Sequence, residues 1–129
     1  MKMTRLSLLG LVAGVAGCSF AARSPEMYRD DTAALLETRS AQIKGCYDEA
    51  LKTNATLQGR VAVQFKVQPD TGKVTDVAAD PAGTTAPDPL TRCVVDSLQG
   101  LVLTPPDKRL GNALYTWEFT ASPTPPAAG

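Results

Sequence analysis

The sequence from Gly59 to Gln68 reads GRVAVQFKVQ, and apolar residues alternate in it with polar or small ones. The larger apolar side chains fall on one face of an extended chain, and they are Val61, Val63, Phe65 and Val67. This period of two predicts a strand with one buried face and one exposed face. Such a strand needs a second layer over its apolar face, and this requirement decides the fold class.

Two further strands are expected. Pro69-Asp70-Thr71-Gly72 is typical of a turn, so the strand predicted for Lys73 to Ala79 forms a hairpin with the first one. Val74 and Val77 are out of phase, which indicates a bulge or a short edge strand. The third strand covers Asn112 to Thr120. Its aromatic residues share one face, where core packing is favoured over a binding stripe; they are Tyr115, Trp117 and Phe119.

Two helices are expected to cover the sheet. The first starts either at Ser24-Pro25 or near Asp30 and Asp31, and it ends near Asn54. The second starts at Asp88-Pro89 and is broken by Thr104-Pro105-Pro106. Apolar residues recur at helical spacing in both. In the second helix this face holds Leu90, Cys93, Val94, Ser97, Leu98 and Leu101.

The predicted order is therefore α-β-β-α-β. It describes an α+β two-layer domain over residues 30–120, in which a hairpin and one further strand form a three-stranded sheet with two helices on one face. Residues 121–129 are rich in proline and poor in large apolar side chains, so a disordered tail is expected there.

The N-terminus carries a targeting pattern. Lys2 and Arg5 precede an apolar run of roughly twelve residues, which is shorter than the about twenty that a membrane span needs. The run ends in Val15-Ala16-Gly17-Cys18, which resembles the lipobox of bacterial lipoproteins. This resemblance implies a signal peptide over residues 1–17, a lipid on Cys18 and a tether over residues 18–29. The alternative is an ordinary secretory signal with a chance cysteine.

The two remaining cysteines are Cys46 and Cys93. Both lie on the core-facing sides of the predicted helices, and an even pair in a small exported domain favours a disulfide. The alternative is two buried free thiols that pack as small apolar side chains.

Five segments together resemble the AgmX/PglI C-terminal domain, a family related to the C-terminal domain of the energy transducer TonB. They are Cys46–Leu51, Leu57–Phe65, Gly72–Val74, Cys93-Val94 and Trp117–Phe119. The resemblance covers roughly Ala33 to Thr120, and the paired cysteines match the family's pattern. It departs at Leu103-Thr104-Pro105-Pro106, where the family usually has an aromatic residue, and at Asp80–Gly83. The resemblance implies a link to gliding motility or envelope transport, whereas TonB's own membrane span and long proline-rich segment have no counterpart here.

Several kinds of chemistry are disfavoured. The chain has no histidine, which is the commonest general base and metal ligand. Asp70-Thr71-Gly72 matches half of the aspartic-protease pair and is better explained as a turn. The 13 basic and 13 acidic residues form no basic stripe, so no nucleic-acid partner is expected. We therefore expect no catalytic residue, no metal site and no cofactor, and a hydrolase is the least favoured function.

The remaining prediction is recognition through a sheet edge. An exposed edge strand can accept an extended peptide, and by analogy with TonB-like domains we expect the last strand to do so, through Asn112, Leu114, Thr116 and Glu118. The alternative is that the tail or the tether covers this edge.

The predicted function is a non-enzymatic lipoprotein that binds another envelope protein. It is held by the lipid on Cys18, with the periplasmic face of the outer membrane favoured over the inner membrane because Ser19, not aspartate, follows Cys18. A passive structural or self-associating lipoprotein is the second hypothesis, and the sequence leaves the oligomeric state and the partner open.

Overall fold

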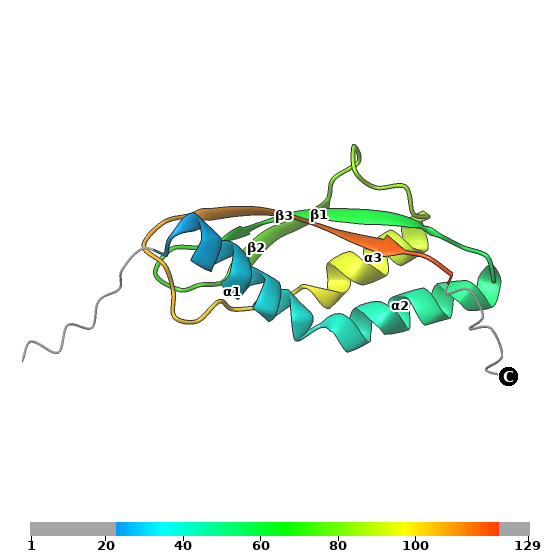
Figure 1. The fold of residues 1–129 in the computed structure, drawn as a ribbon, viewed down its shortest axis with the longest axis horizontal. Coiled ribbons are helices and arrows are strands. Elements are labelled where there is room, and N and C mark those ends of the chain that lie inside the picture. The colour runs from blue at the N-terminus through cyan, green and yellow to red at the C-terminus, as the bar shows by residue number, and fades with distance from the viewer. Residues whose placement is uncertain (1–22, 122–129) are drawn as a thin grey trace, which may run out of the picture.

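The central strand, β1 (Gly59–Val67), pairs with a strand on each side. β2 (Val74–Ala79) and β3 (Gly111–Phe119) are both antiparallel to it, so the sheet has the order β2-β1-β3. The computed structural model describes residues 23–121 (Figure 1). The predicted signal peptide, Cys18 and residues 122–129 lie outside the described residues. The predicted α+β class and the three strands are confirmed.

Three helices, one more than expected, cover one face of the sheet: α1 (Pro25–Glu37), α2 (Ser40–Thr53) and α3 (Asp88–Ser97) (Figure 1). The order is therefore α-α-β-β-α-β. α1 starts at the first of the two predicted positions, because the Ser24 hydroxyl accepts a hydrogen bond from the Met27 amide and Pro25 occupies the first turn. Residues 25–29, which the sequence analysis assigns to a tether over residues 18–29, are therefore helical and belong to α1.

The single helix predicted from Ser24-Pro25, or from Asp30 and Asp31, to Asn54 is interrupted at Thr38 and Arg39. The Thr38 hydroxyl donates to the Leu35 carbonyl at 2.6 Å, and the Thr38 and Arg39 amides bond three residues back. Such side-chain bonding competes with the regular helical pattern and bends the chain. Helical periodicity continues across the break, since Leu36 and Ile43 are both buried, and this is why the sequence alone predicts one helix.

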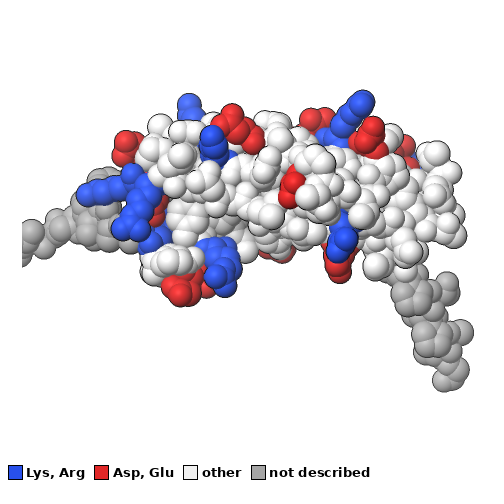
Figure 2. Space-filling view, turned by 90° about the horizontal axis from the view of Figure 1, so that it is seen from above, with Lys and Arg blue, Asp and Glu red and all other residues white. Residues whose placement is uncertain are grey.

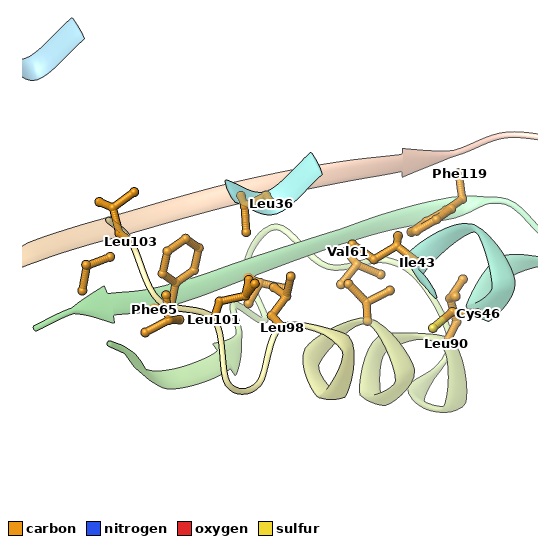
Figure 3. Packing of buried hydrophobic residues seen from close by; sticks show 14 of the residues in the cluster. Leu36, Ile43, Cys46, Val61, Phe65, Leu90, Leu98, Leu101, Leu103 and Phe119 are labelled. Carbon is orange, nitrogen blue, oxygen red and sulfur yellow. The ribbon is translucent and has the colours of Figure 1, made fainter. Parts of the chain in front are cut away.

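The helices bury the apolar face of β1. Val61, Val63, Phe65 and Val67 are all at most 3% exposed, as the alternation predicts. The opposite face is turned toward the viewer in Figure 2 and is open except where the loop of residues 80–86 covers Ala62. The side chains of the core come from all six elements and from the segment after α3 (Figure 3).

The disulfide prediction is confirmed. Cys46 of α2 and Cys93 of α3 are bonded, with their Cα atoms 5.7 Å apart. Next to this bond, the Tyr47 ring lies 5.1 Å from the ring of Phe119 at the end of β3. The disulfide therefore fixes two helices to each other beside the last residues of the sheet.

Two irregularities shape the sheet edges. β2 contains the expected bulge, where Asp76 has a φ of 53° and the register with β1 shifts by one residue. α3 ends at Ser97, earlier than the predicted break at Pro105, because Gly100 turns the chain with a φ of 80°. Leu101 thus leaves the helix and is buried in the connection to β3.

Candidate functional site

The two edges of the sheet differ in how far they are covered. The outer side of β2 begins beside residues 101–103, where the Val74 amide bonds the Leu101 carbonyl and the Leu103 amide bonds the Gly72 carbonyl. The bulge at Asp76 interrupts the rest of this edge. In contrast, β3 pairs with β1 in an unbroken register of nine residues, and no strand within residues 23–121 pairs with its other side. β3 is therefore the open edge.

The backbone of β3 shows which residues face outward. Arg60 and Ala62 of β1 exchange hydrogen bonds with the loop of residues 80–86 on the β2 side. Main-chain groups in a strand alternate in direction, so the amides and carbonyls of the odd-numbered residues of β1 point toward β3. The matching residues of β3 are the odd-numbered ones, such as Tyr115 opposite Val63. The amides and carbonyls that face away from the sheet then belong to the four predicted edge residues: Asn112, Leu114, Thr116 and Glu118.

The side chains of these four residues are exposed, and Leu114 reaches 60% exposure. The aromatic side chains of β3 point to the helix layer, where Phe119 is buried and the half-buried rings of Tyr115 and Trp117 lie 4.7 Å apart against the core. Core packing of the aromatic stripe, which the sequence favours, is thus confirmed. β3 offers solvent an open ladder of main-chain groups together with four exposed side chains.

A groove of about 420 Å³ lies between α1 and the first half of β3. Its floor is apolar, and α1 lines it with residues three or four positions apart: Pro25, Tyr28, Arg29, Thr32 and Ala33. The floor includes Phe65, Ala113 and Tyr115. Asn112 and Leu114, two of the outward-facing residues, also line the groove. The groove therefore opens along the strand edge.

A buried ionic cluster lies at the end of the groove that is nearest to the N-terminus of α1. Asp107 is 3% exposed and accepts hydrogen bonds from the amides of Arg23 and Arg109, at 2.9 and 3.0 Å. These hydrogen bonds lower the pKa of Asp107 from its ordinary value of 3.8. The Arg23 guanidinium bonds Asp31 at 2.7 Å and the Pro105 carbonyl at 2.6 Å. The cluster thus joins the start of α1 to the loop before β3.

Two buried hydroxyl groups beside this cluster have no hydrogen-bond partner within residues 23–121: those of Tyr28 and Thr32. The Tyr28 ring lies directly against Gly111, in space that any larger residue would fill. Burial, and then the Asp107 carboxylate, raise the pKa of Tyr28. Buried polar groups are normally paired. Both of these hydroxyl groups belong to residues that line the groove, whereas the third unpaired buried atom in residues 23–121, Arg39 Nε, does not.

The sequence alone does not indicate Arg23, Tyr28 and Asp107 as a group. The first two lie in a segment expected to be a tether, and Asp107 lies in a loop 84 residues along the chain from Arg23. The one local signal is the helix start at Ser24-Pro25, which places Tyr28 and Arg29 on a helix. The approach of Tyr28 to Gly111 and the hydrogen bond of Arg23 to Asp107 are both long-range, so no local periodicity indicates them.

The other predicted features stand as follows. Cys18 lies outside the described residues, and Cys46 is bonded to Cys93. Within residues 23–121 no cluster of three candidate metal ligands is present, and no helix of this part of the chain has the length and apolarity to cross a membrane.

Comparison with known proteins gives no significant match to this chain, whether with protein-family models, curated proteins or solved structures.

Proposed function

We propose that this protein is a non-enzymatic lipoprotein of the cell envelope, whose domain binds an extended segment of another envelope protein by strand addition at β3. The observation that carries the proposal is the contrast between the two sheet edges, since only β3 combines a regular ladder with an uncovered outer side in the described part of the chain. An edge of this kind supplies main-chain hydrogen bonds to a partner strand.

The proposed anchor rests on the sequence. The lipobox-like Val15–Cys18 gives a lipid on Cys18, and Ser19 favours the periplasmic face of the outer membrane. Stable membrane binding needs more than one acyl chain, which bacterial lipoproteins carry. The resemblance to the AgmX/PglI family supports the same picture and adds gliding motility or envelope transport as the setting.

Thr116→Pro tests the edge with little disturbance of the sheet. The Thr116 amide faces outward, so proline removes a donor that β1 does not use, and edge strands tolerate proline at such positions. The matched control is Thr116→Ala, which also loses the side chain but keeps the amide. We expect proline to weaken binding of a partner strand about tenfold or more, through one lost hydrogen bond and the clash of its ring.

The measurement is proximity labelling in cells, with an engineered peroxidase fused to the C-terminus of the full chain and supplied with biotin-phenol and hydrogen peroxide. The proposal predicts specific envelope neighbours that Thr116→Ala retains and Thr116→Pro loses, while both variants remain folded by circular dichroism. An identical set of neighbours for the two variants would refute strand addition at β3. Labelling of the protein's own copies alone would support the self-associating alternative.

A further inference from the structure

We propose that the strand accepted at β3 is acidic, and that Arg29 and Arg109 bind its carboxylate in the groove under the edge. This inference rests on the proposed function, because it concerns which peptide the β3 edge selects. A strand added beside β3 turns every second side chain toward the helix layer. Along the first half of β3, that layer is the groove wall formed by α1.

The groove is long enough to hold one or two side chains of an added strand. Pro25 and Ala33 are eight helical residues apart, which corresponds to about 12 Å along α1. α1 starts beside the start of β3 and passes under the sheet (Figure 1). At about 3.4 Å per residue, this length matches three to four residues of an added strand. One or two of their side chains would therefore enter the groove.

The charges that line the groove are three arginines and one aspartate: Arg23, Arg29, Arg109 and Asp107. Arg23 and Asp107 are already engaged, since the Arg23 guanidinium bonds Asp31 and Asp107 accepts two amide hydrogen bonds. Arg29 and Arg109 are exposed, and neither forms an ion pair within the described residues 23–121. Two uncompensated guanidinium groups therefore remain for a ligand.

Basic side chains, with acidic ones beside them, lie at the end of the molecule where α1 begins, on the left of Figure 2. A carboxylate is the group that arginine binds best, through short charge-assisted hydrogen bonds. A lysine or arginine on the added strand would meet like charges in the same place. Charge complementarity therefore selects acidic peptides over neutral and basic ones.

The test uses three synthetic peptides and the intact lipoprotein in detergent micelles. Each fluorescein-labelled peptide has the sequence Ser-Val-Ser-Xaa-Ser-Val-Ser, with Glu, Gln or Lys at Xaa, so that both valines and Xaa share one face. We expect the Glu peptide to bind about tenfold more tightly than the Gln peptide, and the Lys peptide to bind most weakly. Fluorescence anisotropy gives the three affinities.

Two variants locate the effect. The double variant Arg29→Gln/Arg109→Gln should reduce the preference for Glu over Gln to less than about twofold. Arg92→Gln is the matched control, because Arg92 is an exposed arginine on α3 that does not line the groove, and it should keep the full preference. Equal loss in both variants would indicate a general charge effect and would overturn the assignment to Arg29 and Arg109.

The outcomes separate this inference from the proposed function. Equal binding of the Glu and Gln peptides, abolished for both by Thr116→Pro, would overturn acidic selectivity and leave strand addition standing. Absence of binding by all three peptides up to about 1 mM, together with neighbours that Thr116→Pro does not change, would refute strand addition and the inference with it.

Discussion

The two ends of this domain are held together by different interactions. At the stapled end, α2 and α3 are joined by the Cys46–Cys93 disulfide and Tyr47 packs on Phe119. At the groove end, the segment before α1 and the loop before β3 are joined by the ionic cluster of Arg23 and Asp107, beside a groove of about 420 Å³. The first end is filled by apolar packing and a covalent bond, whereas at the second, within residues 23–121, two arginines have no ion pair and two buried hydroxyl groups have no hydrogen-bond partner. We infer that stability and recognition are assigned to opposite ends.

The largest expected effect comes from removing the disulfide. Replacing both cysteines by alanine should lower the free energy of unfolding by about 4 kcal/mol, because the unfolded chain regains the entropy of an open loop. Urea denaturation measures the change, and reduced wild-type protein is the control that should match the variant. A loss below about 1 kcal/mol would mean that packing between α2 and α3, not the bond, holds this end.

The same comparison predicts that the peptide preference of the groove does not depend on the disulfide. Below the urea concentration at which the double alanine variant unfolds, it should retain the preference for the Glu peptide. If selectivity disappears while the variant is still folded, the two ends are coupled and the proposed division between them is wrong.

A smaller effect is expected from Asp107→Asn, which should cost about 2 kcal/mol through loss of charge-assisted hydrogen bonds at a buried site. The lowered pKa of Asp107 gives a pH signature. Its contribution is fully present well above pH 3.8 and is lost as the pH falls through that value toward the lower pKa of the folded state. The difference in stability between wild type and variant should therefore be constant above about pH 5 and shrink below about pH 4.

Urea denaturation at a series of pH values measures this difference. Asp48→Asn is the control, because Asp48 forms an exposed ion pair with Lys44 on α2 and should change stability by less than about 0.5 kcal/mol. A difference between wild type and Asp107→Asn that does not depend on pH would show that the Asp107 carboxylate is not the group that joins α1 to the loop before β3.

The same contrast explains how much could be predicted from the sequence. The strand Gly59–Val67, the turn after it and the facing cysteines follow local patterns, namely period two, turn residues and helical spacing, and the structure contains all three. The helix break at Thr38 depends on a few local hydrogen bonds, of the Thr38 hydroxyl and of the Thr38 and Arg39 amides, and these leave the apolar periodicity unchanged. The groove depends on Arg23 meeting Asp107, a contact between distant segments that no local pattern encodes.

The prediction that β3 is the open edge of the sheet depends partly on local patterns and partly on contacts between distant segments. Alternation along β3 predicts which residues point away from the core, so Asn112, Leu114, Thr116 and Glu118 are identified correctly as exposed. Whether an edge is open depends on what lies beside it. β2 is partly covered because residues 101–103 return to Gly72 and Val74, and that segment was expected to begin as helix.

The smallest expected effect on stability, and the sharpest test of the groove, is Gly111→Ala. A Cβ atom at Gly111 would overlap the Tyr28 hydroxyl and ring, so the ring must move, at a cost of about 1–2 kcal/mol. Because Tyr28 lines the groove, its displaced ring should occupy part of that space and weaken binding of the Glu peptide about tenfold.

Gly45→Ala is the control: nothing lies within 4 Å of its added Cβ on α2, so binding should not change and the stability of the helix should increase slightly. Adding Tyr28→Ala to Gly111→Ala removes the overlapping ring and should restore binding, a non-additive result that only direct contact between the two positions explains. If the double variant binds no better than Gly111→Ala alone, the groove beside Gly111 is not where the peptide side chains lie, and strand addition would have to occur nearer Phe119, at the stapled end.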